Sequence, residues 1–408
     1  MADRLIRRSE GLYGWVVLGL LFTAQLVMSM GAYAWGPLAP FLRETFGISR
    51  SQIGQITSAL YVTAALTGLP SGIMVDRWGA RKLLLACLVI MMVSFFFIGL
   101  MDHFVGIVVF AAFAGMGYGV LNQVSTKGIM LWFSAKDRAT AMGIKQTGVT
   151  IGAAGASLLL PMVTVTYGLG PSFIFISLMM FPAILGVAVF YAEKPAKPPA
   201  GSSGAKRLNG KTDLMGTLLH PEILTILVIL PFMCFNQLSL STFFVLYLTE
   251  AVKISVGAAG SCLAVIMVSG AVGRVVWGFV SDRFFKGNRQ KPLILLSLIG
   301  AICVIPLSLL PPHAPLFLCL MLSAGLGGAF LGWNGLIITY IAELAGTSIA
   351  ASVVGVSSSI GFIGIISGPL LFGYLVDLFG YFTGWMMLAG IWLANAFGLF
   401  YLRIRGGE

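Results

Sequence analysis

The chain has 408 residues, of which 58% are hydrophobic and only 10% are charged. Soluble globular domains carry about 25% charged residues, so this composition excludes that class and places most of the chain in lipid. The formal net charge is +11. The basic residues are spread along the chain and do not form one patch, so we expect no nucleic-acid partner.

Twelve apolar runs follow one another along the chain, and each is long enough to cross a bilayer. About 20 residues at 1.5 Å per residue span a hydrocarbon core of about 30 Å. The sequence therefore predicts an all-α membrane protein with twelve transmembrane helices. The runs cover residues 13–38, 51–71, 82–101, 104–132, 139–162, 171–191, 221–249, 255–280, 292–310, 315–341, 347–372 and 379–402.

The basic residues predict the orientation of these helices. Nineteen of the 25 Lys and Arg residues fall in the termini and in alternate loops on one side, against Arg43, Arg50 and Lys253 on the other. Because basic loops stay in the cytoplasm, both termini are predicted to be cytoplasmic. We expect a multi-pass protein of a cell membrane, and the short outer loops favour a bacterial inner membrane.

A polar segment at 193–218 divides the chain. It is rich in Pro, Gly, Ser and Lys, as flexible linkers are. We predict an N-terminal six-helix bundle at 1–192, a cytoplasmic linker at 193–218 and a C-terminal six-helix bundle at 219–408. The halves also repeat, since "GIMVDRWGARK" after the second helix matches "GFVSDRFFKGNRQK" after the eighth. Such duplication is typical of secondary transporters.

The first of these loops carries a specific pattern, G-x-x-x-D-R-x-G-x-R-K, formed without a gap by Gly72, Asp76, Arg77, Gly79, Arg81 and Lys82. It resembles the signature loop of the major facilitator superfamily. The resemblance covers the whole chain and implies the major facilitator fold, two pseudo-symmetric six-helix bundles, for which we expect a monomer. It also implies a gating role for Asp76, Arg77, Arg81, Asp282 and Arg283. For Arg81 the alternative is simple membrane topology.

Three cations lie inside predicted membrane helices, namely Lys127, Lys145 and Arg274, whereas all 14 acids lie at termini, loops or helix ends. A cation at the centre of a membrane helix costs about 2.5–3.5 kcal/mol or more, so we expect the substrate to supply the missing anion. At 1.5 Å per residue, Arg274 lies roughly 12 Å and Lys145 roughly 10 Å from the cytoplasmic edge. Lys127 is shallower, and for it we favour a position at the interface.

Arg274 is the strongest candidate for substrate binding. The pattern R-x-x-x-G before the second loop resembles helix 8 of the monocarboxylate transporters and oxalate/formate exchangers, where the matching arginine contacts the substrate carboxylate. Its counterpart in the first half, 206 residues earlier, is Gly68, so the repeat itself does not require a cation there. A planar guanidinium suits bidentate recognition of a carboxylate.

Polar residues on helices 1, 4, 7 and 10 could complete the site, because these helices line the cavity in the family that the chain resembles. We expect Tyr118, Asn122, Asn236 and Asn334 to bind substrate, since each can hydrogen-bond a carboxylate or hydroxyl. The alternative is that they cross-link helices. Further candidates on these helices are Gln25, Tyr33, Gln237 and Tyr340.

No pattern indicates catalytic residues, a metal site or a cofactor. The five cysteines lack metal-ligand spacing, and no nucleophile motif is present. "GMGYG" at 115–119 resembles a phosphate-binding loop but follows no strand, so we expect it to pack helices closely. We therefore do not expect an enzyme.

The leading hypothesis is a secondary active transporter that moves a small organic anion, a mono- or dicarboxylate, by alternating access. It could act as an exchanger, by facilitated diffusion or as a proton-linked symporter. One alternative is multidrug efflux, for which we would expect a membrane-embedded Asp or Glu. The other is a membrane receptor that senses a ligand without moving it.

Overall fold

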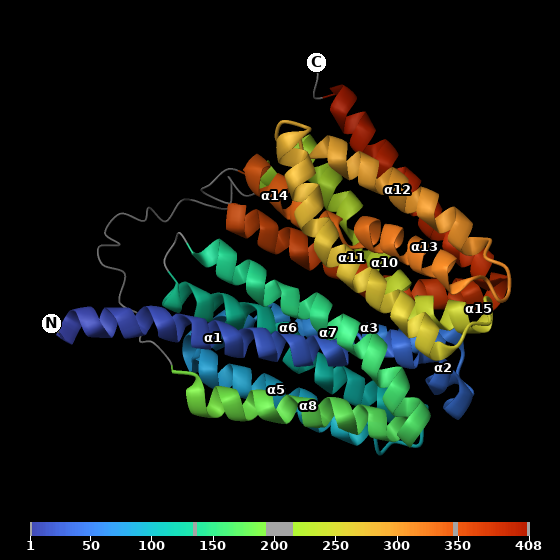
Figure 1. Ribbon diagram of the computed structural model, residues 1–408. Coiled ribbons are helices and arrows are strands. Elements are labelled where there is room, and N and C mark those ends of the chain that lie inside the picture. The colour runs from blue at the N-terminus through green and yellow to red at the C-terminus, as the bar shows by residue number, and fades with distance from the viewer. Residues whose placement is uncertain (1, 134–136, 193–214, 346–349, 406–408) are drawn as a thin grey trace. The chain divides into compact units, whose positions relative to one another are not determined.

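A computed structural model describes residues 2–133, 137–192, 215–345 and 350–405. These residues are almost entirely helical and fall into two compact units (Figure 1). Unit 1 comprises Met1–Ile48 and Gln55–Pro198, and unit 2 comprises Ser49–Gly54 and Pro199–Glu408. Most of the predicted linker at 193–218 lies outside the described residues, which end at 192 and resume at 215.

Unit 1 is built from helices that break at glycines, at proline or at short turns. In it α1 packs against α6, α7 and α8, and α5 packs against α6 and α8 (Figure 1). Its helices are α1 Ala2–Ala32, α2 Trp35–Phe46, α3 Arg50–Gly68, α4 Ser71–Trp78, α5 Ala80–Ile98, α6 Phe104–Trp132, α7 Arg138–Tyr167 and α8 Leu169–Phe190, with the first turn of α3 assigned to unit 2.

Unit 2 has the same kind of architecture. Here α15 packs against α10 and α12, and α11 packs against α13 and α10 (Figure 1). Its helices are α10 Pro221–Glu250, α11 Val256–Arg283, α12 Gln290–Ser308, α13 Leu316–Phe330, α14 Trp333–Ala345 and α15 Ala350–Arg405.

The predicted all-α membrane fold is confirmed, and the observed helix bounds differ from the predicted apolar runs in detail. Ten helices among the described residues are long and apolar enough to cross a membrane. The longest of these segments, Val353–Tyr401, contains Gly380, whose φ is 81°. At this residue α15 is kinked and divides into two helical segments. The predicted run at 51–71 corresponds to α3, which is too rich in Ser, Thr and Gln to be among the ten.

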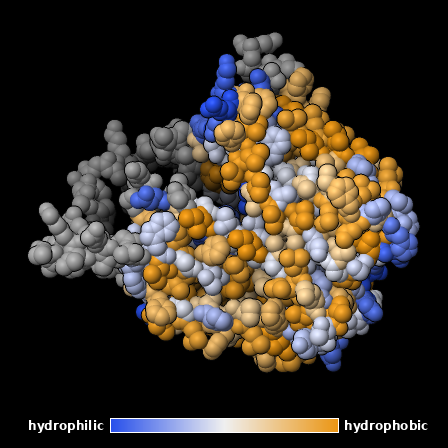
Figure 2. All heavy atoms as spheres, viewed as in Figure 1, coloured by the Kyte–Doolittle hydropathy of each residue, from blue (hydrophilic) through white to orange (hydrophobic). Residues whose placement is uncertain are grey.

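Helix α8 illustrates how a helix meets protein on one side and lipid on the other. Phe173, Ile176 and Met180 are buried in unit 1, whereas Phe181 and Val189 are 53% and 67% exposed. A helix that is apolar all round is stable only where both faces avoid water. Hydrophobic side chains cover much of the visible surface in the same way (Figure 2). These exposed faces are therefore suited to contact lipid tails.

The segment "GMGYG" packs α6 against α3, as predicted. A Cβ atom added at Gly115 would lie 2.0 Å from the carbonyl oxygen of Leu60. Thr63 uses the same close approach, because its hydroxyl donates to the carbonyl oxygen of Ala112 on α6 at 2.6 Å. Small residues at such positions let backbones approach closely in membranes, where helix association depends on packing and polar contacts.

This close contact predicts the effect of one methyl group. We expect Gly115→Ala to lower stability by about 1–3 kcal/mol, because the added carbon overlaps a backbone oxygen that cannot move aside easily. Gly155→Ala on α7 is the matched control, since nothing lies within 4 Å of a Cβ there. Both substitutions raise helix propensity by the same amount. The difference in melting temperature between the two purified variants therefore reports the destabilisation caused by the steric overlap at residue 115. Equal melting temperatures would contradict the contact.

Candidate functional site

Lys145 on α7 is the most deeply buried cation that the structure describes. Its side chain is only 1% exposed. Its Nζ donates to Oδ1 of Asn122 on α6 at 2.7 Å and approaches Oε1 of Gln146 at 3.5 Å. Both partners are neutral amides, and no carboxylate in the described part of the chain forms an ion pair with it. The structure thus brings together Lys145 and Asn122, two residues predicted for the site.

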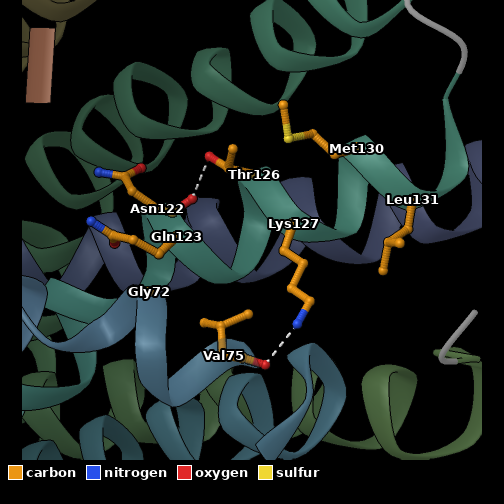
Figure 3. A pocket seen from close by; sticks show the side chains of 8 residues that line it. All are labelled: Gly72, Val75, Asn122, Gln123, Thr126, Lys127, Met130 and Leu131. Atoms are coloured by element: carbon orange, nitrogen blue, oxygen red, sulfur yellow. Dashed lines mark hydrogen bonds between the residues drawn. The ribbon is translucent and has the colours of Figure 1, made fainter. Parts of the chain in front are cut away.

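Asn122 also lines a pocket within unit 1 (Figure 3). The pocket has a volume of about 370 Å³. Polar and apolar residues of α4 and α6 line it, namely Gly72, Val75, Asn122, Gln123, Thr126, Lys127, Met130 and Leu131. A pocket that mixes an apolar wall with a few convergent polar groups is typical of a small-molecule site.

Lys127 lines this pocket, and its expected position at the membrane interface stays a prediction. Its Nζ donates to the carbonyl oxygen of Val75 on α4 at 3.0 Å (Figure 3). The side chain is partly buried and turned toward α4. Depth along the helix could not reveal this, because the direction of a side chain depends on its rotation about the helix axis.

Tyr118 lies one turn before Asn122 on α6, so the two residues share a face of that helix. Its ring meets the ring of Tyr61 on α3 edge-on, with centroids 6.1 Å apart. Tyr61 is buried, whereas Tyr118 is partly exposed. Tyr118 is thus placed on the same side of α6 as the partner of Lys145.

In unit 2, Arg274 on α11 is held at a break between two helices. Its Nε donates to the carbonyl oxygen of Leu331 at 3.1 Å. Leu331 lies between the end of α13 and the start of α14, where a carbonyl can lack an intrahelical partner. Asn334 donates to the same oxygen at 3.2 Å and to Oε1 of Gln237 at 2.9 Å. Arg274 and Asn334, both predicted for the site, therefore meet at one carbonyl.

Asn236 lies apart from this cluster. It is fully buried, and its Nδ2 donates to the carbonyl oxygen of Leu388 on α15 at 3.3 Å. Its Oδ1 is buried without a hydrogen-bond partner in the described residues. The neighbouring residue Gln237 is the one that contacts Asn334. Both were candidates in the sequence, and successive residues on a helix point about 100° apart.

The junction of α4 and α5 carries the predicted gating residues of unit 1, with Asp76 and Arg77 at the end of α4 and Arg81 at the start of α5. Arg77 is exposed, and Arg81 donates to the backbone carbonyl of Ala188 on α8. The backbone of Asp76 is helical, but its side chain lies outside what the structure describes. Gly79 before Arg81 has a φ of 85°, a conformation that favours glycine.

In the second loop the predicted gating residue Asp282 contacts Arg289, a basic residue for which gating and simple membrane topology were both open from the sequence. Asp282 accepts a hydrogen bond from Arg289 at 2.5 Å, and Arg289 also pairs with Glu343 on α14 at 2.8 Å. The hydrogen bonds that Arg289 donates to Glu343 and, less strongly, to Asp282 hold the pKa of its guanidinium above its usual range. Arg283 is exposed. Arg289 stands two residues after Gly287, whose φ of 82° is close to the 85° of Gly79, and Arg81 stands two residues after Gly79.

Comparison with known proteins identifies the family. A family model described as Major Facilitator Superfamily matches residues 21–369. The chain is 25% identical to the hexuronate transporter of Bacillus subtilis strain 168 over 92% of this chain and 90% of that protein. It is 24% identical to a probable L-galactonate transporter of Escherichia coli K12 over 88% of this chain and 82% of that protein.

A solved structure agrees in fold. A bacterial homologue of the human lysosomal transporter Spinster, in an inward-facing and unoccupied conformation, superposes with a TM-score of 0.76 at 18% identity, and the match covers 95% of each chain. Members of this family are transporters and not enzymes, and they bind small molecules within the membrane. The chain is therefore a multi-pass membrane protein that belongs to the major facilitator superfamily.

Proposed function

We propose that this chain moves a small organic anion across the membrane by alternating access. The observation that carries the proposal is the burial of Lys145 against two neutral amide oxygens. Neutral partners do not offset the charge of a buried ammonium, and a ligand carboxylate is the complement that would offset the cost of burial. Arg274 places a second cation in unit 2.

The relatives support a narrower class of anion, a carboxylate that carries several hydroxyl groups. Two of the relatives are named for hexuronate and L-galactonate. Both substrates are sugar acids with one carboxylate each. The amides beside the two cations fit this class, because an amide can both donate to and accept from a hydroxyl. Asn122 and Gln146 lie at Lys145, and Asn334 and Gln237 lie near Arg274.

Loss of either cation is expected to impair uptake strongly. In proteoliposomes we expect Lys145→Gln and Arg274→Ala each to raise the KM for galactonate about 30-fold or more, since loss of one partner of a buried charge pair costs about 2 kcal/mol or more. Radiolabelled galactonate, glucuronate, lactate and oxalate test the substrate class. Uptake with and without a pH gradient, and with unlabelled anion inside, distinguishes symport from exchange.

The matched control is Lys253→Gln, which removes an exposed cation outside the membrane helices and is expected to leave uptake unchanged. Wild-type vesicles that take up none of these acids would overturn the proposal. Export of lipophilic cations by the same vesicles would favour multidrug efflux in its place.

The geometry of Arg274 predicts that charge alone is not sufficient. We expect Arg274→Lys to raise the KM about five- to tenfold, between wild type and Arg274→Ala, because lysine keeps the charge but loses the planar fork that grips a carboxylate with two hydrogen bonds. The lysine would also lose the Nε contact to Leu331. A KM equal to that of wild type would show that the guanidinium acts only as a point charge.

A further inference from the structure

The contact between Asn334 and Gln237 in unit 2 fixes the direction of both amide groups. Nδ2 of Asn334 lies 3.2 Å from the carbonyl oxygen of Leu331 and 2.9 Å from Oε1 of Gln237. A backbone carbonyl can only accept a hydrogen bond, so the Asn334 atom beside it must be the nitrogen. That nitrogen can only donate, so the Gln237 atom that faces it must be the oxygen. One backbone atom therefore sets the orientation of the pair.

This orientation leaves one acceptor and one donor group unused. Nδ2 of Asn334 spends its two hydrogens on Leu331 and Gln237. Oδ1 of Asn334 and Nε2 of Gln237 have no hydrogen-bond partner among the described residues. Both residues are partly exposed, and neither of these two atoms belongs to the buried unpartnered polar atoms in the described part of the chain. The two groups are therefore accessible to another molecule.

The depth of Gln237 shows why these groups need a partner. Gln237 lies on α10 between Pro221 and Glu250, roughly 20 Å or more from either end of the helix at 1.5 Å per residue. It is therefore near the middle of a membrane helix. Hydrocarbon cannot accept a hydrogen bond from an amide, so polar groups at this depth face water or a ligand.

The two groups together restrict which ligand group can pair with them. A carboxylate accepts from Nε2 of Gln237 but has no hydrogen to donate to Oδ1 of Asn334. An ammonium group donates to Oδ1 but cannot accept from Nε2. A hydroxyl both donates and accepts. A hydroxyl, or two neighbouring hydroxyls of one ligand, therefore matches the pair.

The amide pair also adjoins the cation of unit 2. Nε of Arg274 donates to the Leu331 carbonyl oxygen at 3.1 Å, and Nδ2 of Asn334 donates to the same oxygen at 3.2 Å. The guanidinium and the amide pair thus meet at one backbone atom. A ligand whose carboxylate contacts Arg274 has only its first carbons beside the amides. The hydroxyl that reaches them must therefore be close to the carboxylate along the carbon chain.

We infer that Asn334 and Gln237 select acids with a hydroxyl on the second or third carbon, counted from the carboxylate carbon. Oδ1 of Asn334 accepts a hydrogen bond from the ligand, and Nε2 of Gln237 donates one to it. The inference rests on the proposed function and deepens it, since it names the residues that read the position of a hydroxyl. An analogue without that hydroxyl leaves both amides unpaired, and sites of this kind reject such analogues strongly.

The test compares acids that differ only in the position of one hydroxyl. Uptake of radiolabelled galactonate into proteoliposomes is measured against unlabelled hexanoate and 2-, 3- and 6-hydroxyhexanoate, which share a six-carbon chain. We expect 2- or 3-hydroxyhexanoate to inhibit about tenfold more strongly than 6-hydroxyhexanoate and hexanoate, because only a hydroxyl near the carboxylate reaches the amides.

Two variants of Gln237 test the donor. Gln237→Met has a similar volume and no N–H group, and we expect it to lower the preference for the near hydroxyl about threefold or more while the inhibition constant of hexanoate stays the same. Gln237→Glu keeps the oxygen that faces Asn334 and replaces the outward nitrogen. We expect the same fall in preference, even though its charge weakens every acid. Gln55→Met, at an exposed residue of α3, is the matched control and is expected to change none of the four constants.

The failures of the inference and of the proposed function differ. Equal inhibition by the 2-, 3- and 6-hydroxy acids in wild type would overturn the inference, and so would an unchanged preference in Gln237→Met or equal weakening of all four acids by it. In each of these cases uptake of galactonate still supports the proposed function. Wild-type vesicles that take up neither galactonate nor any other acid would overturn the proposed function itself.

Discussion

Hydrocarbon offers no hydrogen bonds, and this constraint governs both the fold and the placement of its charges. Backbone groups must be satisfied within the protein, which is why the described residues are almost entirely helical. The same constraint applies to side chains. Lys145 meets Asn122, Lys127 meets a carbonyl of α4, and Arg274 meets a carbonyl at a helix break. Each membrane cation thus contacts a polar group supplied by a neighbouring helix.

Helix contacts follow the same logic. Lipid tails provide no driving force to expel apolar side chains, so close packing and polar bonds must hold the helices together. The contact between α3 and α6 uses both, because Gly115 permits the approach and Thr63 bonds the facing backbone. The exposed apolar face of α8 makes no such helix contact and is suited to contact lipid.

Much of the fold could be predicted from sequence because it depends on composition over about 20 residues. Arg274 and Lys145 could be singled out from sequence as candidates, since a cation in an apolar run is costly wherever it points, and their binding role stays a prediction. The choice of Gln237 over Asn236 as the neighbour of Asn334 was not predictable, because adjacent residues differ only in their rotation about the helix axis. The contacts of Lys127 with Val75 and of Arg289 with Glu343 could not be predicted either, since these partners are distant in sequence.

The two signature loops show how a duplicated element diverges. Gly79 and Gly287 both have a positive φ, of 85° and 82°, and an arginine stands two residues after each. Arg81 bonds a backbone carbonyl on α8, whereas Arg289 pairs with two carboxylates. The glycine with positive φ recurs in both loops, whereas the contacts of the arginine after it differ. A salt-sensitive interaction is therefore present in the second loop, and the described contact of Arg81 is with a neutral group.

The break between α13 and α14 has a consequence for the empty protein. Leu331 presents one carbonyl to both Arg274 and Asn334, so the guanidinium has a polar contact before any ligand arrives. Under the proposed function, this contact lowers the energy of the unloaded state. A carrier whose unloaded form is stable can return across its cycle without cargo, so under the proposed function net flux of the anion would not require one-for-one exchange.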